Sequence, residues 1–479
     1  MNTRMIARTI GLALLVEAAL MSLPLITAIY YREYPNAFLA VMLIAGAIGF
    51  LLMRIHPKST MIYARDGFVA VSLVWIAMSA FGALPFVISK DIPNFVDAFF
   101  ETMSGFTTTG ATILTDIEGL SRSGLFWRSF THWIGGMGVL VFMMAVLPLS
   151  GEHSMHIMRA EVPGPVVGKL VPRAGDTAKI LYVIYAALTL LETVFLLFGG
   201  MSFYDALLHA FATAGTGGFS TRNASIAAFD SAYIEIVIST FLVLFGTNFN
   251  LFYLILIRKA KEAFRSEEFR WYLVLIFVSV SAITAGIYGI YGSLGESARN
   301  AYFYVMSIVS TAGFCTVDYT TWPQYTQVII VMLMFIGGCA GSTGGGIKLS
   351  RVILLLKNAM ADVSRMISPR RVKRVRMDGK CVPDGVINTI CAFFFMYIFI
   401  LLLCTLIVSF DGADFTTSFT AALSCISNVG PGLGKVGPAY NYSDFSILSK
   451  IAMAFTMLTG RLEIFPVMIL LMPRWLRKK

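Results

Sequence analysis

Four segments of this sequence share one frame of 13 residues, and no other feature restricts the possible fold as strongly. Each segment opens on a polar residue, continues as an apolar stretch and ends in Gly/Thr-rich sequence. In chain order the segments run from Asp97 to Gly110, from Asp205 to Gly218, from Asn300 to Gly313 and from Thr417 to Gly430. Asp, Asn and Thr are favourable helix N-caps, so each segment predicts a half-helix of about ten residues, capped by its opening residue. An extended Thr-x-Gly turn follows each half-helix.

The chain around these segments is too apolar for a water-soluble protein. Of its 479 residues, 57% are hydrophobic and 13% are charged, whereas a soluble domain is about 45–50% apolar and about 25% charged. This composition excludes a soluble enzyme, a coiled coil and a disordered chain, and it indicates a polytopic membrane protein.

Apolar runs of about 20 residues, the length that crosses a bilayer as a helix, occur ten times. The expected spans are approximately 5–30, 36–54, 66–89, 125–149, 179–200, 233–257, 271–292, 325–356, 386–409 and 445–472. Each half-helix lies between two spans, so the unit of span, half-helix, turn and span occurs four times, after two spans outside the repeat. We therefore expect an all-α membrane protein with ten spans and four re-entrant half-helices.

The basic residues indicate the orientation of the chain. With ten spans both termini lie on one side, and of the 37 Lys and Arg residues 28 fall on that side, in the termini and in 54–65, 151–179, 258–270 and 348–380. Eight fall on the opposite side. Cytoplasmic segments carry an excess of Lys and Arg, so both termini are expected in the cytoplasm. The net charge of +10 is therefore a topology signal and does not indicate a nucleic-acid partner.

Four re-entrant loops predict a central aqueous path for a cation. Non-helical backbone is tolerated at membrane depth only where it lines such a cavity. The C-terminal ends of half-helices carry partial negative charge, and rings of backbone carbonyls can replace the hydration shell of K⁺. The expected carbonyl ring, which binds K⁺ through the backbone only, comprises Thr108, Thr109, Gly110, Thr216, Gly217, Gly218, Thr311, Ala312, Gly313, Asn428, Val429 and Gly430.

Glycine at the fixed position of every segment can adopt torsions closed to other residues and favours K⁺ over Na⁺ selectivity. In the second segment Gly217 competes with Gly218 for that position, and the 13-residue frame favours Gly218. The alternative, that these glycines only allow close helix packing, does not account for a frame repeated four times.

This fourfold unit with one filter glycine each resembles the bacterial Trk/Ktr potassium-transporter superfamily, which is related to the plant HKT proteins. The resemblance covers essentially the whole chain, and the two extra N-terminal spans place it on the Trk side. It implies a pseudo-fourfold pore within one subunit of the bacterial cytoplasmic (inner) membrane. The corresponding units are 1–60 for the extra spans, then 61–165, 166–262, 263–365 with a glycine-rich gating loop, and 366–479.

A glycine-rich run interrupts the eighth apolar stretch at residues 337–346. In the related proteins the loop of the third unit lies under the filter and acts as a gate, and this role maps onto Gly337, Gly338, Gly341, Ser342, Thr343, Gly344, Gly345 and Gly346. Close-packing glycines are an alternative. A phosphate-binding loop is disfavoured, because Ile347 separates Gly346 from Lys348 and no strand precedes the run.

Arg461 is a cation within the last expected span. At 1.5 Å per residue it lies about 20 Å from the cytoplasmic Arg474, too far for its side chain to reach the interface. The family has an arginine in this span that projects into the pore below the filter, so we expect Arg461 to be a barrier to permeating K⁺. A structural salt bridge is the alternative, and Glu463 is on another helix face.

The resemblance further implies a homodimer, surrounded by membrane lipid, that binds a cytoplasmic regulatory ring of the TrkA type. Nucleotide and NAD are expected on that partner, and no cofactor is expected on this chain. The basic stretch 365–380 is equally compatible with lipid headgroups and with docking of the ring. Glu17 and Glu192 lie within spans, where they could pair with polar neighbours or line a crevice.

Three rival functions differ from selective K⁺ uptake in the features they need. A Na⁺-permeable or poorly selective member of the same superfamily shares all of these features. A secondary transporter would have two inverted repeats with broken helices, and a membrane enzyme would need paired carboxylates or a histidine cluster. Channel-like uptake and proton-coupled symport are both compatible with the sequence.

Overall fold

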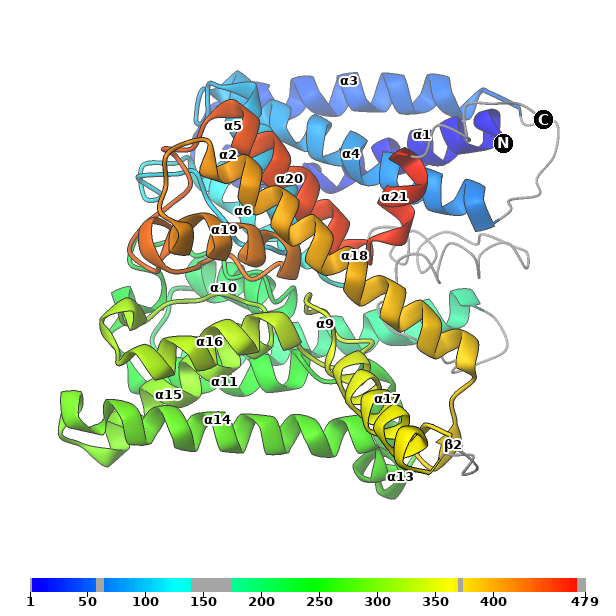
Figure 1. The fold of residues 1–479 in the computed structure, drawn as a ribbon. Coiled ribbons are helices and arrows are strands. Elements are labelled where there is room, and N and C mark those ends of the chain that lie inside the picture. Colours follow the sequence, from blue (N-terminus) through cyan, green and yellow to red (C-terminus); the bar gives the residue numbers. More distant parts are fainter. Residues whose placement is uncertain (1, 57–63, 139–173, 369–373, 472–479) are drawn as a thin grey trace.

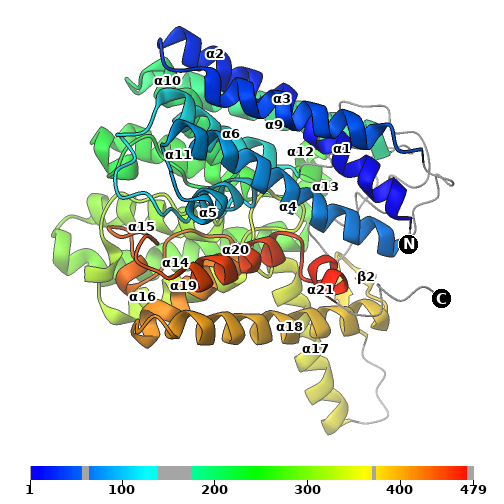
Figure 2. The same ribbon diagram turned by 90° about the horizontal axis from the view of Figure 1, so that it is seen from above.

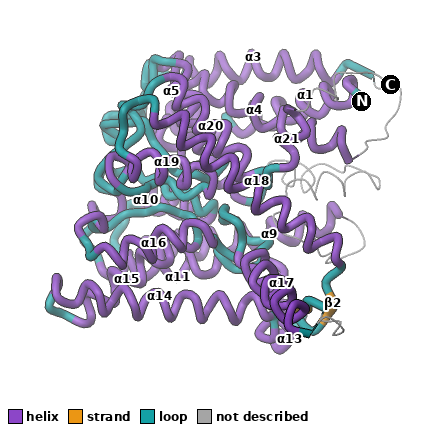
Figure 3. The backbone as a smooth tube through the Cα atoms, viewed as in Figure 1, coloured by secondary structure: helices purple, strands orange, loops and turns teal. Residues whose placement is uncertain are grey.

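The computed structural model describes residues 2–56, 64–138, 174–368 and 374–471, and this part of the chain is almost entirely helical (Figure 1, Figure 3). Six of its helical stretches are long and apolar enough to cross a membrane. They are Thr3–Tyr30, Asn36–Met53, Arg65–Ser89, Asp176–Phe198, Glu267–Tyr291 and Asp384–Ser409. The prediction of an all-α polytopic membrane protein is confirmed.

Three helices precede the repeated part: α1 (Thr3–Leu20), α2 (Ser22–Tyr30) and α3 (Asn36–Met53). The backbones of α1 and α3 approach closely at Gly11 and Gly49, since a Cβ atom built on either glycine would lie 2.8 Å from the other's carbonyl oxygen. Such contacts between small residues are a common way for helices to associate in lipid. Helix α1 also packs on α4 (Ala64–Ser89), which attaches the pair to the first repeat.

Three kinds of helix then recur four times in the same order. The long first helices are α4, α9 (Ala174–Phe198), α14 (Glu267–Tyr291) and α18 (Asp384–Ser409). The half-helices are α5 (Phe95–Phe106), α10 (Phe203–Ala214), α15 (Leu294–Val309) and α19 (Phe415–Ser427). The second helices are α6 (Arg122–Gly136), α11 (Ala232–Phe245), α16 (Gln324–Ile336) and α20 (Ile447–Arg461).

The half-helices connect the repeats into a closed circle. Helix α10 packs on α6, α15 on α11, α19 on α16 and α5 on α20, so each half-helix contacts the second helix of the repeat before it in the circle. The last of these contacts joins the fourth repeat to the first, and Figure 2 shows α5 beside α20. The segment after each half-helix is therefore held between two repeats.

The half-helices begin earlier than the sequence indicated. Their N-caps are Asn94, Ser202, Ser293 and Asp414, so the assignment of Asp97, Asp205, Asn300 and Thr417 as caps is wrong. The physical reason is visible in the second repeat, where Ser202 Oγ accepts a hydrogen bond from Asp205 N. In three repeats a polar residue three positions after the cap, as is typical of a capping box, was mistaken for the cap. In the third repeat Asn300 stands seven positions after Ser293, inside α15.

The second helices end inside the apolar stretches that were expected to be single spans. Each has 13–15 residues and is about 20–22 Å long, less than the roughly 30 Å of a bilayer core. The expected spans 233–257 and 445–472 are therefore wrong as continuous helices. Helix α12 (Phe249–Leu256) turns from α11 by 87°, and α21 (Phe465–Leu471) follows α20 after a break. The continuation of 125–149 beyond residue 138 lies outside the described residues.

Of the elements not yet described, the α-helices and the strands lie on the side of the start of α1 (Figure 1). They include α13 (Ala260–Arg265), α17 (Leu349–Ile367) and a hairpin of β1 (Arg376–Met377) with β2 (Lys380–Cys381), in which Arg376 pairs with Cys381. In both Figure 1 and Figure 2 this hairpin and the start of α1 lie at one end, while the loops after the half-helices lie at the other. The fold thus has two distinct ends, with the half-helices between them.

Candidate functional site

The four segments after the half-helices, which we call the filter strands, share one backbone conformation. They are residues 108–110, 216–218, 311–313 and 428–430. Their first residues have φ values of 53°, 54°, 62° and 55°, and their glycines have φ values of 78°, 77°, 77° and 99°. Gly218, rather than Gly217, has the conformation of the other filter glycines. The first position was expected to be extended and is left-handed instead, which is strained for a β-branched residue such as Thr108.

Each filter glycine lies against a carbonyl of the next filter strand. A Cβ atom built on Gly110 would lie 2.0 Å from the Gly217 carbonyl oxygen, and one on Gly218 would lie 1.9 Å from that of Ala312. For Gly313 the neighbour is the Val429 oxygen at 2.0 Å, and for Gly430 it is the Thr109 oxygen at 2.7 Å. The sequence of contacts returns to the first strand, so the four strands form a closed ring in chain order.

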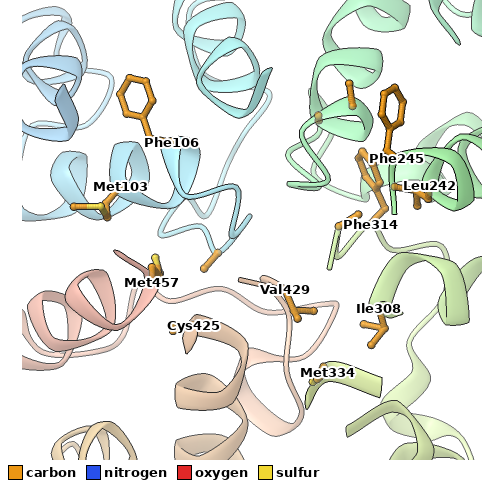
Figure 4. Packing of buried hydrophobic residues seen from close by; sticks show 14 of the residues in the cluster. Met103, Phe106, Leu242, Phe245, Ile308, Phe314, Met334, Cys425, Val429 and Met457 are labelled. Atoms are coloured by element: carbon orange, nitrogen blue, oxygen red, sulfur yellow. The ribbon is translucent and has the colours of Figure 1, made fainter. Parts of the chain in front are cut away.

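The ring is enclosed by side chains from all four repeats. Figure 4 shows Phe106, Phe314 and Val429 in this region together with the ends of the neighbouring helices. The first residues of the four strands are fully buried. The half-helices end directly before the strands, so their partially negative C-terminal ends face the ring. This environment favours a cation.

In three repeats a half-helix side chain nine residues before the filter glycine binds the chain just after that glycine. We call these residues, Glu101, His209 and Tyr304, the brace residues. The Glu101 carboxylate accepts from Thr112 Oγ1 at 2.9 Å and from Ile113 N at 3.0 Å. The corresponding position of the fourth repeat is Ala421, and Thr420 replaces it, with its hydroxyl accepting from Leu433 N at 2.9 Å.

The other two brace residues use different chemistry at the same place. His209 Nε2 lies 2.9 Å from Ser220 Oγ. The Tyr304 hydroxyl accepts from the backbone N–H groups of Thr316 and Val317, each at 3.0 Å. Each half-helix thus fixes the end of its own filter strand that follows the glycine. A carboxylate, an imidazole and a phenol make the four quarters of the ring chemically unequal.

A buried ion pair joins the first two strands. Arg128 Nε lies 2.6 Å from Glu101 Oε1, and both side chains are at most 2% exposed. The Arg128 guanidinium also donates to the Ser220 carbonyl at 3.0 Å and lies 3.5 Å from the centre of the Phe219 ring. The charge on the Glu101 brace is therefore compensated, and Arg128 connects the first repeat to the second strand.

A cavity of about 390 Å³ lies on the side of the ring where the filter strands end. All four filter glycines line it, together with residues that follow each strand, such as Thr112, Ser220, Cys315 and Tyr442. The Asn223 amide, which lies at its rim, donates to Asp116 at 3.0 Å and lowers the pKa of that carboxyl. Asp116 therefore carries a negative charge beside the cavity, whose lining itself contains Arg128, Arg222 and Asp318.

The glycine-rich run forms a non-helical loop between α16 and α17 that contacts the opposite side of the ring, where the filter strands begin. Gly345 N donates to Thr311 Oγ1 at 2.7 Å. A Cβ atom on Gly345 would lie 2.3 Å from the Ser427 oxygen, and one on Gly344 would lie 2.6 Å from the Ser310 oxygen. The loop therefore touches the third and fourth filter strands, and side chains at these two glycines would displace it.

The same loop satisfies the backbone exposed by the break after α11. Cys339 N donates to the Gly246 oxygen at 3.0 Å, and Phe249 N donates to the Gly341 oxygen at 3.0 Å. The Thr343 hydroxyl donates to the Phe245 oxygen at 3.2 Å. Unpaired backbone groups at membrane depth are costly, so the loop and the break in the second repeat stabilise one another.

Glu268 and Lys348 hold the two ends of the loop. Glu268, on α14, accepts from Ala340 N at 2.7 Å and from Ser350 N at 3.1 Å through the same oxygen. Lys348 donates to the Gly344 carbonyl and lies 3.4 Å from Ser342 Oγ. The carboxylate and the ammonium group are both buried, so they fix the loop from opposite ends.

Arg461 ends α20 and binds backbone carbonyls. Its guanidinium donates to the oxygens of Thr343, Gly135 and Gly136, each at 2.6 Å, and the side chain is 7% exposed. It therefore joins the loop to the end of α6. Glu463, which is close in sequence, instead pairs with Arg351 at 2.5 Å.

Sequence reasoning missed several residues around the ring. His132 and His209 are fully buried against filter strands, and Glu268 holds the loop. The signal for His209 was the 13-residue frame, since it stands at the same place in the frame as Glu101. His132 and Glu268 lie outside the frame, and no such signal marked them. Glu17 and Glu192 are fully buried, and Glu17 lies beside Gly82 of α4.

Long apolar helices around a ring of half-helices with carbonyl-bearing turns define a polytopic membrane transport protein. The family model described as "TrkH: Cation transport protein" matches residues 33–474, so the chain belongs to the TrkH family. The Trk system potassium uptake protein TrkH of Escherichia coli is 37% identical over the full length of both chains. TrkI of Halomonas elongata is 31% identical over 99% of this chain and 97% of its own.

A solved structure has the same fold. The crystal structure of the potassium transporter TrkH from Vibrio parahaemolyticus superposes with a TM-score of 0.89, at 33% identity and over 100% of both chains. The resemblance stated from the sequence is confirmed, and so is the expectation of a transport protein rather than an enzyme.

Proposed function

We propose that this chain takes up K⁺ across the bacterial cytoplasmic membrane through the ring of the four filter strands. The observation that carries the proposal is the closed sequence of glycine-to-carbonyl contacts, from Gly110 through Gly218 and Gly313 to Gly430. Carbonyls held in such a ring can replace the hydration shell of K⁺. The relatives with this fold are named as potassium uptake proteins.

The expected architecture forms part of the proposal. The repeats 61–165, 166–262, 263–365 and 366–479 surround one pseudo-fourfold pore, and 1–60 lies beside it. The count of 28 basic residues against eight supports cytoplasmic termini and an outer position for the 390 Å³ cavity. K⁺ would then enter through that cavity and meet the loop 337–346 after the filter strands.

The loop and Arg461 together form the proposed gate. Thr343 and Gly345 tie the loop to Arg461 and to Thr311, so the loop cannot leave its place without breaking contacts to the filter strand. The positive charge of Arg461 would oppose a cation emerging from the ring. Moving α20 or the loop would remove both obstacles.

Partners complete the proposed function. The relatives are named as proteins of a Trk system, which supports further components beside this chain. The proposed assembly is a homodimer of this chain regulated by a cytoplasmic ring of the TrkA type. Nucleotide would act on that ring, and K⁺ would be the substrate of this chain, which is proposed to have no cofactor of its own.

Weaker selectivity among cations is the second candidate, and one observation favours it. The Gly430 carbonyl accepts hydrogen bonds from Ser424 Oγ at 2.6 Å and from Tyr442 Oη at 2.8 Å. Two hydroxyl donors reduce the electron density that this oxygen offers to an ion. The fourth quarter of the ring would then bind K⁺ more weakly than the other three.

The test is growth of a bacterium that lacks its own K⁺ uptake systems. Expression of this chain, with or without a co-expressed regulatory ring, is expected to restore growth at low K⁺. Uptake of Rb⁺ and Na⁺ by the same cells then distinguishes the selective from the poorly selective candidate. Failure of both strains to grow, with the protein present in the membrane, would refute the proposal.

A further inference from the structure

The second filter strand differs from the other three at its middle position. Thr109, Ala312 and Val429 have side chains there, and Gly217 has none. Gly217 is not among the residues with positive φ, so its backbone conformation does not require glycine. The reason for a glycine at this position must therefore lie in its surroundings.

The ring of His132 occupies the place of a side chain at position 217. A Cβ atom built on Gly217 would lie 2.5 Å from the Cγ and Nδ1 atoms of His132 and 2.6 Å from its Cδ2 atom. Two residues earlier, a Cβ atom on Gly215 would lie 2.3 Å from the His132 carbonyl oxygen. The other repeats have Thr107, Ser310 and Ser427 at that earlier position. Helix α6 of the first repeat thus takes the space of two side chains of the second.

Hydrogen bonds fix the imidazole in this position. His132 is fully buried, and its Nδ1 lies 2.7 Å from the Gly105 carbonyl oxygen of half-helix α5. Because a carbonyl only accepts, Nδ1 carries the proton, and Nε2 accepts from Phe219 N at 3.3 Å. The ring also stacks on Phe219, with 4.1 Å between the ring centres. The imidazole therefore spans from one half-helix to the residue that follows the filter glycine of the next repeat.

We infer that His132 is a positioning residue for the second filter strand, and that it sets the contribution of this strand to the K⁺/Na⁺ selectivity of the ring. It replaces the missing side chain of Gly217 and orients the backbone of Gly218 through the N–H of Phe219. This inference rests on the proposed K⁺ filter. It gives the first repeat control over the geometry of the second strand, beyond the Arg128 contact to Ser220.

The test is a double-mutant cycle of His132→Ala, Gly217→Ala and the double variant, measured as the K⁺/Na⁺ uptake ratio in the deficient strain. His132→Ala is expected to lower the ratio about tenfold, since it leaves the Phe219 N–H unpaired. Gly217→Ala should lower it at least as much in the wild-type background, where the methyl group overlaps the imidazole. In the His132→Ala background the same substitution should have little further effect, because the space is then free.

Two further variants separate positioning from general damage. His132→Gln keeps a donor for Gly105 and an acceptor for Phe219, and should retain most of the ratio. Gly289→Ala, at an open glycine of α14, is the matched control and should behave as wild type. If His132→Ala does not accumulate in the membrane, the double-mutant cycle is run with His132→Gln instead. The glutamine side chain is flexible and can move away from the methyl group that Gly217→Ala adds.

The outcomes distinguish this inference from the proposed function. Wild-type cells that take up no K⁺ would refute the function itself. Wild-type cells that take up K⁺, with Gly217→Ala equally harmful in both backgrounds, would overturn the role of His132. The same conclusion would follow if His132→Ala reduced the amount of protein in the membrane but left the K⁺/Na⁺ ratio unchanged.

Discussion

Glycine is needed at the filter positions because a Cβ atom there would overlap the backbone of the next strand. The sequence indicated that these residues need unusual torsions, and their φ values of 77–99° agree. It could not indicate that the would-be side chains point at Gly217, Ala312, Val429 and Thr109 of the neighbouring strands, since that depends on how the repeats close. The residues most sensitive to substitution are therefore those at the seams between repeats.

Gly313→Ser tests whether a side chain at the contact between two repeats disturbs the filter. Its Cβ would lie 2.0 Å from the Val429 oxygen and 2.6 Å from Pro431 Cδ, so the fourth strand must shift. We expect the K⁺/Na⁺ uptake ratio to fall about tenfold, or about 1.4 kcal/mol of discrimination. Gly412→Ser is the matched control, because Gly412 has a φ of 74° and open space around it. Equal ratios for the two variants would contradict the seam argument.

Substitutions of Arg461 test the proposed gate. Arg461→Ala removes the positive charge and three hydrogen bonds to carbonyls, and basal K⁺ flux is expected to rise by about tenfold, equivalent to a barrier lowered by about 1.4 kcal/mol. Arg461→Gln removes the charge and keeps a donor for the Thr343 carbonyl. A rise in both variants assigns the barrier to charge, and a rise in the alanine variant alone assigns it to the tie between loop and helix. Slower flux in Arg461→Ala would contradict the barrier role.

The half-helices and the second helices differ in how far sequence could predict them. The half-helices follow from a local frame, and only their caps were misplaced, because a polar residue within the first two turns resembled a cap. The ends of α11 and α20 were missed, since Gly246 and Gly460 are single small residues within apolar runs. The break after α11 is stable only because Cys339 and Thr343, about 90 residues later, bind the freed carbonyls, and no local pattern contains that information.

The loop between α16 and α17 should loosen when Glu268 is replaced. Glu268→Ala leaves the N–H groups of Ala340 and Ser350 without their acceptor, at a cost of about 1–3 kcal/mol for each buried donor. We expect a higher basal flux with an unchanged K⁺/Na⁺ ratio, because the filter strands keep their own contacts. Glu268→Gln retains one acceptor oxygen and should lie between the alanine variant and wild type. A changed ion ratio with unchanged basal flux would show that Glu268 acts on the filter instead.

At the scale of the whole molecule, one chain closes a ring that other proteins would need four subunits to form. Composition indicated a membrane protein, and the 13-residue frame indicated four equivalent loops. The closure itself depends on α5 packing against α20, residues more than 300 positions apart. Unlike a ring of identical subunits, this one has three different brace residues, Glu101, His209 and Tyr304, and in the fourth repeat Thr420 acts in place of the brace position Ala421. Substitutions can therefore change the geometry of each filter strand separately. The fourth strand differs most from the others in the residue that holds its end.

The orientation of this ring in the membrane gives a prediction for the whole chain. Cys381 in β2 is an exposed free thiol, whereas the other exposed cysteine, Cys391, lies within the apolar helix α18. If the basic segments are cytoplasmic, a membrane-impermeant maleimide should label Cys381 in spheroplasts only after permeabilisation. Tyr440→Cys at the cavity, in a background with Cys315→Ser and Cys381→Ser, should be labelled in intact spheroplasts, because Tyr440 is 62% exposed and the other thiol of the cavity is then absent. Labelling of Cys381 in intact spheroplasts would reverse the topology and with it the side from which K⁺ reaches the filter strands.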